Sequence, residues 1–207
     1  MEPTPIQRNI IQEEGNTVVL AMPGSGKTFV LSEKIRRILE SDVLKDYQGV
    51  IAISYTRKAS GHLKRKTLQN GTWEKNSFFG TIDSFCLTQI ILPFGHYVIG
   101  YPKEEVVPIT ENDLEKDKMV DFEWINKIHP DYEEINEAVW ENLYELFKEG
   151  KVLVSSLELV ALHIIKNCPA CRAHLKARFK YVFIDEFQDA DTYTNGIFLE
   201  LIGLGLI

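Results

Sequence analysis

The sequence has few of the features that mark secreted and membrane-embedded proteins. Its 207 residues include only three cysteines, too few for a disulfide framework in a chain of this length. The longest apolar runs, such as Val50–Ile53 and Val182–Ile184, are far shorter than the ~20 residues that cross a bilayer. The N-terminus has no basic start followed by an apolar core, the pattern of a secretory signal. We therefore expect a cytoplasmic protein without a membrane partner.

The sequence has no overall excess of positive charge, and its charged residues are unevenly distributed along the chain. Hydrophobic residues make up 44% and charged residues 26%, as in ordinary globular domains, and the net charge is −7. Residues 54–75 contain six basic residues and one acidic residue, whereas residues 104–149 contain fifteen acidic and four basic ones. The first stretch is a basic patch, and the second indicates a separate module.

Four short apolar runs, each bounded by polar residues or glycine, have the pattern of buried parallel strands. A segment between the first two has the apolar spacing of a helix with one buried face, so the chain is expected to begin as strand, loop, helix, strand. The expected strands are Thr17–Ala21, Val50–Tyr55, Phe78–Thr81 and Tyr181–Ile184, and the expected helix is Lys27–Glu40.

The middle of the sequence is expected to be helical. Tyr132–Phe147 and Leu157–Ile165 both carry apolar residues at helical spacing. Strand and helix signals alternate on either side of this region, which indicates an α/β domain with a parallel sheet. We therefore predict one domain made of residues 1–91 and 166–207, interrupted by a helical subdomain of residues 92–165.

A glycine-rich loop follows the first expected strand and precedes the expected helix, the context in which a Walker A loop binds phosphate. Glycines let backbone N–H groups turn toward phosphate oxygens, and the helix directs its positive end at the same anion. Lys27 is expected to reach the β and γ phosphates, and Thr28 to ligate Mg²⁺. The alternative is an ordinary glycine-rich turn before a helix. The expected nucleotide-binding residues here are Ala21, Pro23, Gly24, Ser25, Gly26, Lys27 and Thr28.

Adjacent carboxylates follow the last expected strand in the sequence Asp185-Glu186-Phe187-Gln188-Asp189. Charges at the end of a buried strand cost free energy unless they have a function. Asp185 is expected to hold Mg²⁺, Glu186 to orient or deprotonate the attacking water, and Gln188 to sense the γ phosphate. The alternative is an acidic helix N-cap.

Together with three further segments, these motifs resemble the first motor domain of UvrD/Rep-type superfamily 1 DNA helicases. Pro5-Ile6-Gln7 is similar to the family's glutamine motif, and Ala21 to Thr28 to its AxxGSGKT loop, in which alanine is normal at the first position. The residues from Ser54 to Ser60 resemble TFTNKAA, those from Gly80 to Phe85 resemble GTFHS, and DEFQD is the family's second motif.

The resemblance implies a P-loop NTPase (RecA-like) fold and an ATP- and Mg²⁺-dependent DNA helicase or translocase that moves along single-stranded DNA. It implies that Gln7 reads the adenine. An aromatic residue beside a basic groove is also what single-strand binding requires physically. Without the flanking motifs, Tyr55 would be an ordinary strand-end aromatic. The residues expected to contact DNA are Tyr55, Thr56, Arg57, Lys58 and Thr81.

Two departures from the family pattern bear on this interpretation. Asp83 stands where the family usually has histidine, which places a negative charge near the expected DNA path. The sequence also ends at Ile207, before the family's third motif and second motor domain. The resemblance implies that the third-motif strand lies between the expected strands at 17–21 and 181–184. We expect later residues of a longer chain, a partner chain or a rearranged sheet to fill this gap, with Leu201–Ile207 covering part of it.

A second function stays open at the level of the sequence. The chain could be an ATP-binding, DNA-contacting regulatory module that switches a partner protein in a multi-protein complex, without strand separation of its own. Compact insertions of this kind also occur, as the resemblance suggests, in helicase-like proteins of anti-phage systems. The isolated chain is expected to bind ATP better than it cleaves it, since an arginine finger from elsewhere can contribute ~10³ to 10⁵ in rate.

One cluster has the composition of a zinc site. His163, Cys168, Cys171 and His174 offer two nitrogen and two sulfur ligands within twelve residues. The alternative is that these residues pack within helices, and because no other part of the chain supports zinc, we favour that alternative.

We predict that Lys27→Ala abolishes ATP binding, because it removes the one cation expected to neutralise the β and γ phosphates. Titration with a fluorescent ATP analogue measures the effect. An unchanged affinity in the variant would contradict the assignment of the phosphate loop.

Overall fold

The computed structural model describes residues 2–22, 24–114 and 130–207. The chain divides into two compact units, each described here by itself. Unit 1 comprises residues 1–81, 174–189 and 201–207, and unit 2 comprises residues 82–173 and 190–200. The boundaries of the two domains expected from the sequence stay a prediction.

Unit 1 is built on a three-stranded parallel sheet with the strand order β2-β1-β5. The strands are β1 (Gly49–Ile53), β2 (Phe78–Gly80) and β5 (Phe179–Ile184). Every residue of β1 is buried, as the unbroken apolar run of a central parallel strand predicts. Ile53 is in register with Gly80 on one side and with Ile184 on the other, so the three strands end at the same edge. The predicted α/β class with a parallel sheet is confirmed.

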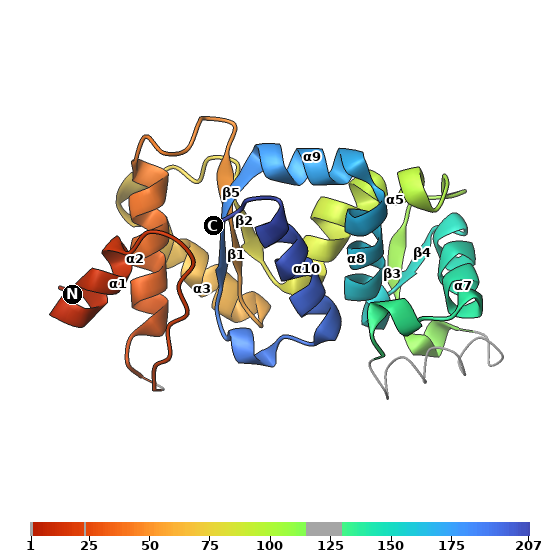
Figure 1. The fold of residues 1–207 in the computed structure, drawn as a ribbon, viewed down its shortest axis with the longest axis horizontal. Coiled ribbons are helices and arrows are strands. Elements are labelled where there is room, and N and C mark those ends of the chain that lie inside the picture. The colour runs from red at the N-terminus through yellow and green to blue at the C-terminus, as the bar shows by residue number, and fades with distance from the viewer. Residues whose placement is uncertain (1, 23, 115–129) are drawn as a thin grey trace. The chain divides into compact units, whose positions relative to one another are not determined.

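Helices α1 (Pro5–Gln12), α2 (Lys27–Glu40) and α3 (Arg57–Thr67) lie together on one side of this sheet (Figure 1). The predicted bounds of α2 are confirmed. The core between helices and strands consists of seven mutually packed apolar side chains, each at most 8% exposed: Ile35, Leu39, Leu44, Val50, Ala52, Leu63 and Phe183. This packing holds α2 against the sheet through Ile35 and Leu39, and the glycine-rich loop leads into the N-terminal end of the helix.

The strand predicted at residues 17–21 is wrong. These residues have no strand pairing in the structure, and the side chains of Val18 and Leu20 are 81% and 93% exposed. An extended segment is a strand only when a neighbour pairs its N–H and C=O groups, and here the segment has apolar β-forming residues without that neighbour.

The edge of β5 that faces away from β1 is paired by the last residue instead. Ile207 donates its N–H to Lys180 O at 3.0 Å and accepts from Val182 N–H at 2.8 Å. Leu201, Leu204 and Leu206 of the same segment are buried. The expectation that residues 201–207 help to cover this edge is therefore confirmed.

Unit 2 is mostly helical but also contains a small sheet that the sequence did not predict. Strands β3 (Val107–Ile109) and β4 (Lys151–Leu153) pair in parallel. The amphipathic stretch predicted at 132–147 begins later than expected, as α7 (Glu137–Lys148), because Asn136 caps its first turn through Val139 N–H. The stretch predicted at 157–165 is α8 (Leu157–Asn167).

The remaining described elements complete the chain order. A π-helix, η2 (Cys86–Ile91), connects α4 (Ile82–Phe85) to α5 (Leu92–Val98). The longer elements are α9 (Pro169–Arg178) and α10 (Thr192–Gly203). The single-turn 3₁₀ elements are η1 (Gln69–Gly71), η3 (Glu111–Asp113), η4 (Tyr132–Glu134), η5 (Val154–Ser156) and η6 (Phe187–Asp189). Among the described residues, no helix has the length and apolar character needed to cross a membrane.

We predict that Gly49→Ala destabilises unit 1. A Cβ atom at this position would lie 2.4 Å from the backbone of Asn76 and Ser77, so strand β1 and the segment before β2 would have to separate. Overpacking of this kind costs about 1 to 3 kcal/mol of unfolding free energy. Urea unfolding measures the change.

Gly61→Ala is the matched control, because it lies within α3 and its Cβ would meet only Arg65 Nη1, at 3.5 Å. There the better helix propensity of alanine is expected to add up to about 1 kcal/mol. Equal stability of the two variants would contradict the close-approach argument.

Candidate nucleotide and nucleic-acid site

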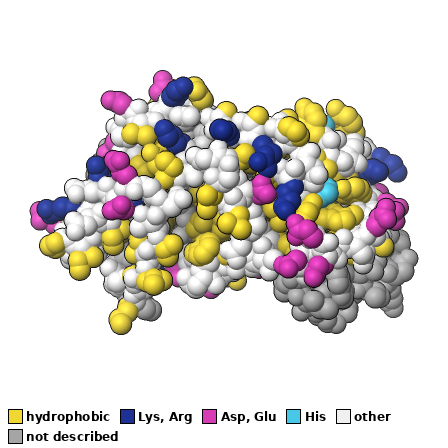
Figure 2. Space-filling view, viewed as in Figure 1, with side chains coloured by type: hydrophobic (Ala, Val, Ile, Leu, Met, Phe, Trp, Pro, Cys, Tyr) yellow, Lys and Arg dark blue, Asp and Glu magenta, His cyan; other side chains and the backbone are white. Residues whose placement is uncertain are grey.

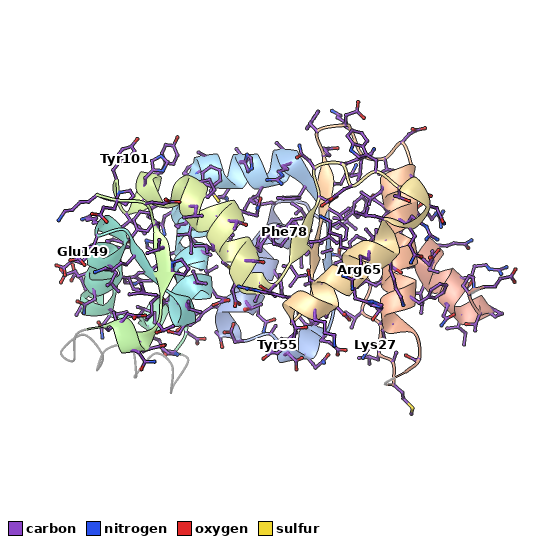
Figure 3. All side chains as sticks on the ribbon, turned by 180° about the vertical axis from the view of Figure 1, so that it is seen from behind. Lys27, Tyr55, Arg65, Phe78, Tyr101 and Glu149 are labelled. Carbon is purple, nitrogen blue, oxygen red and sulfur yellow. The ribbon has the colours of Figure 1, made fainter. Side chains whose placement is uncertain are left out.

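The residues expected to act on nucleotide and DNA meet at one edge of the sheet in unit 1. Ser54 follows β1, Thr81 follows β2 and Asp185 follows β5. Two backbone hydrogen bonds extend the ladder past the strand ends: Ser54 N–H donates to Gly80 O at 3.1 Å, and Asp185 N–H donates to Ile53 O at 2.8 Å. In open α/β sheets the carboxyl edge is where ligands bind. Figure 3 shows Lys27 and Tyr55 at the same end of the unit.

The glycine-rich loop has the backbone conformation that the motif requires. Gly24 and Gly26 have φ values of +78° and +88°, in the left-handed region that favours glycine. Gly26 is the N-cap of α2 and offers no side chain to the first-turn N–H groups of the helix. These groups therefore stay available to an anion, as they would for a bound phosphate. Ala21 and Ser25 are exposed on this loop, and Pro23 lies outside the described residues.

Gln7 connects the first helix to the same loop. Its Nε2 donates to Ser25 O at 3.1 Å, and its Oε1 accepts from Thr4 N–H at 2.9 Å in a capping box at the start of α1. A Cβ at Gly26 would lie 3.0 Å from the same Nε2 atom. The side chain thus stands beside the loop in which the sequence predicts nucleotide binding, while its adenine contact stays a prediction.

Lys27 and Glu186 form an ion pair that joins the glycine-rich loop to the acidic motif. Lys27 Nζ lies 3.3 Å from Glu186 Oε1, and Gln188 Nε2 donates to Glu186 Oε2 at 2.6 Å. The hydrogen bond from Gln188 and then the one from Lys27 lower the pKa of Glu186. Glu186 is therefore a carboxylate at neutral pH, the form in which it can accept a proton or orient a water.

The backbone at Glu186 is also unusual, with a φ of +59° in the left-handed region. A residue with a Cβ atom adopts this conformation at a cost of order 1 to 3 kcal/mol, and such residues cluster at functional sites. The conformation lets the chain turn directly after Asp185, so that two successive carboxylates leave the same strand end.

Asp185 is half-buried beside this pair. Burial, and secondarily the charge of Glu186, raises the pKa of Asp185, while Lys27 opposes the shift. A cation at this position would relieve both effects, since Mg²⁺ favours carboxylate and hydroxyl oxygens. Thr28, in the first turn of α2, is partly exposed and supplies the hydroxyl. Thr28 and Asp185 thus carry oxygen donors of the kind that Mg²⁺ prefers, and their joint binding of the ion stays a prediction.

The residues expected to contact DNA begin helix α3. Tyr55 is 67% exposed, and Thr56 is the N-cap, its Oγ1 accepting from Ala59 N–H at 3.1 Å. Arg57 and Lys58 are exposed in the first turn, which holds no acidic residue. Cations at a helix N-terminus oppose the helix dipole, so this end concentrates positive potential where a phosphate would be stabilised. Thr81 is partly buried at the neighbouring strand end.

A further polar group at this edge was not singled out from the sequence. Ser54 is fully buried, and its hydroxyl has no hydrogen-bond partner among the described residues. Its place at the start of the segment that resembles TFTNKAA was the sequence signal for it, but a serine at the end of an apolar run is usually a packing residue. An unpaired buried hydroxyl costs about 1 to 3 kcal/mol, so its presence at the binding edge marks it as a candidate contact.

Asp83, the departure from the family pattern, belongs to a group of carboxyl side chains in unit 2. It shares a hydrogen bond with Glu158 in the first turn of α8. Burial raises the pKa of Glu158 to about 8, with further contributions from Asp83 and Asp191. Glu158 is therefore mainly protonated at neutral pH, which avoids a buried negative charge at this position.

The four residues with zinc-like composition have other surroundings. His163 has both ring nitrogens occupied, with Tyr132 Oη at 2.7 Å from Nδ1 and Tyr144 Oη at 2.5 Å from Nε2. Burial raises the pKa of the Cys171 thiol to about 12, which opposes the thiolate that zinc needs. Among the described residues, no three histidine, cysteine or acidic side chains are grouped so that they could hold a metal ion.

Comparison with known proteins gives a consistent family match. The UvrD/REP helicase N-terminal domain matches residues 4–98 and 101–204. The chain is 26% identical to Gabija protein GajB from Bacillus cereus over 94% of its own length and 36% of that protein. It is 26% identical to DNA helicase II from Escherichia coli over 85% of this chain and 28% of that protein. A probable DNA helicase II homolog from Mycoplasma capricolum is 25% identical over 84% of this chain and 28% of that protein. The chain thus spans about a third of the length of these relatives.

We predict that the three cysteines are unreactive in the native protein. Cys86, Cys168 and Cys171 are buried free thiols, and burial raises the pKa of Cys86 well above its usual range. A thiol reagent such as DTNB is expected to label them only as fast as the protein opens, and to label all three in denaturant. Rapid labelling of the native protein, or zinc recovered at one equivalent per chain, would contradict this picture.

Proposed function

Because the chain belongs to the UvrD/REP helicase family through that family's N-terminal domain, we propose that it is the ATP-binding portion of a superfamily 1 DNA helicase or translocase with a P-loop NTPase fold. The observation that carries the proposal is the meeting of two chemically different groups of residues at one sheet edge in unit 1. Lys27, Asp185 and Glu186 suit nucleotide, and the exposed first turn of α3 suits single-stranded DNA.

In this proposal the chain's own side chains bind and orient ATP. Lys27 leaves Glu186 and neutralises the β and γ phosphates, while the first-turn amides of α2 receive phosphate oxygens. Mg²⁺, when bound through Thr28 and Asp185, neutralises charge that develops on the phosphates. Gln7 orients the adenine. Lys27 can exchange Glu186 for phosphate at little cost, because its ion pair with Glu186 is about a third exposed and so contributes only ~0 to 1 kcal/mol.

Glu186 then acts on water. Freed from Lys27, its carboxylate accepts the proton of the water that attacks the γ phosphate, and Gln188 holds it in place through the 2.6 Å hydrogen bond. Because Asp185 and Glu186 are consecutive, the metal-binding group and the proton acceptor are fixed relative to each other by the backbone turn at Glu186.

The DNA side uses stacking and phosphate contacts. Tyr55 stacks on a base, Arg57 and Lys58 neutralise phosphates, and Thr56 and Thr81 contact the strand as it passes the sheet edge. We propose that strand separation and full ATP turnover belong to the complete protein, in which the rest of a longer helicase chain or a partner chain supplies further groups.

A second candidate is a regulatory module in a multi-protein complex, with ATP binding and DNA contact but without strand separation. The similarity to Gabija protein GajB over 94% of the chain supports keeping it. The two candidates differ in one measurement: a helicase separates a duplex with a single-stranded tail when ATP is added, and a regulatory module binds both ligands without separating it.

We predict that Glu186→Gln, in the full-length protein, keeps ATP affinity within a few-fold and lowers DNA-stimulated ATP hydrolysis by about 10² to 10⁴, the usual contribution of a general base. Phosphate release with oligo-dT and binding of a fluorescent ATP analogue measure the two quantities. Glu14→Gln, which removes one exposed carboxylate elsewhere in unit 1, is the matched control. Unchanged hydrolysis in Glu186→Gln would exclude Glu186 from the mechanism.

A further inference from the structure

Helix α3 in unit 1 carries positive charge well beyond the first turn described above. It contains five lysine and arginine residues and no acidic residue. Ser60, Leu63 and Thr67 are buried, so they form the side of the helix that packs inward. The opposite side, which we call the α3 basic stripe, is formed by Lys58, His62, Arg65 and Lys66.

The side chains of the α3 basic stripe are open to solvent and have no internal ion pairs. Lys58, His62 and Arg65 are exposed, and Lys66 is partly exposed. Within the described residues, no carboxylate lies within ion-pair distance of the lysine and arginine side chains of the stripe. Lys64, in contrast, lies beside the stripe and is paired with Glu74 at 2.7 Å.

The positive charges of the stripe act together. Lys58 and Arg65 are seven residues apart, which is ~10 Å along the helix axis and close to one Debye length at physiological salt, ~8 Å. Around α1 and α2, at the left of Figure 2, positive and negative side chains are interspersed instead. Because α3 has no acidic residue to offset its cations, this helix concentrates a positive potential that attracts a polyanion.

Arg65 brings its guanidinium group toward the N-terminal end of α3. A Cβ atom at Gly61 would lie 3.5 Å from Arg65 Nη1, so the arginine side chain extends back by about one helical turn. Gly61 has no side chain of its own to occupy this place. The guanidinium group therefore lies over the part of α3 that leads back to Lys58 and Tyr55. Figure 3 shows Tyr55 before the helix and Arg65 further along it.

We propose that the α3 basic stripe binds phosphates of single-stranded nucleic acid, so that a strand bound at Tyr55 continues along α3 and away from the sheet edge. The inference rests on the proposed function, in which Tyr55 and Lys58 hold the strand. Nucleic acid is favoured over an acidic protein segment because an exposed aromatic ring adjoins the cations, and a strand offers bases next to phosphates. Arg65 suits a phosphate, since its planar guanidinium group can donate two hydrogen bonds to it.

The experiment measures binding of the full-length protein to an oligo-dT strand of about 16 nucleotides, by fluorescence anisotropy over a series of salt concentrations. Each phosphate contact with a single strand contributes about 0.7 to the slope of log K against log salt concentration, so Arg65→Ala is expected to make the slope less steep by about that amount. The double variant Arg65→Ala/Lys66→Ala is expected to change the slope by about twice as much. Arg65→Lys keeps the charge and is expected to keep the wild-type slope. Arg37→Ala is the matched control, because Arg37 is an exposed arginine of α2 in the same unit.

The possible outcomes separate the stripe from the proposed function. An unchanged slope in Arg65→Ala and in the double variant, while Tyr55→Ala weakens binding, would overturn the stripe and leave the proposed function intact. A full-length protein that binds no oligo-dT at any salt concentration would overturn both. Light scattering at low salt tests an acidic protein segment as the ligand: self-association that Arg65→Ala abolishes, with unchanged DNA binding, would contradict the nucleic-acid assignment. Thermal unfolding verifies that the variants are folded.

Discussion

The parallel pairing of β1 with both β2 and β5 is the constraint on which the rest of unit 1 depends. Because β1 is buried along its whole length, its side chains must meet apolar partners on both faces, and this fixes the register of the neighbouring strands. The register brings Ser54, Thr81 and Asp185 to one edge. A slip of one residue would displace Glu186 from Lys27 and remove the ion pair that links the glycine-rich loop to the acidic motif.

At that edge, polar side-chain contacts connect the glycine-rich loop to the segments around it. The glycine-rich loop is not anchored by a preceding strand, and the contacts that place it are the hydrogen bond from Gln7 to Ser25 and the ion pair of Lys27 with Glu186. Both use side chains that the proposed function assigns to nucleotide. Lys27 thus has a partner within the chain, the carboxylate of Glu186. A phosphate can replace this carboxylate at a small cost in free energy, because the ion pair is partly exposed.

Two ionisable side chains of unit 2 are buried with hydrogen-bond partners. His163 lies between two tyrosine hydroxyls, and burial lowers its pKa, so the neutral ring is retained. Burial keeps Glu158 mainly protonated, and its side chain is hydrogen-bonded with Asp83. Both arrangements avoid an unpaired charge inside a small helical unit.

The sequence by itself determined the local features. The periodicity of Lys27–Glu40, the apolar runs of the three sheet strands, the glycines at 24 and 26 and the two carboxylates after β5 depend on short-range sterics and on the alternation of apolar residues, which a sequence displays directly. Tertiary structure alone decided the rest. Residues 17–21 have strand-forming side chains, yet their state depends on a partner that no local pattern specifies, and β5 pairs with Ile207 instead. The hydrogen bond between Asp83 and Glu158 and the occupied nitrogens of His163 likewise arise from distances between separate elements, because burial and hydrogen bonding are properties of the packed chain rather than of any segment.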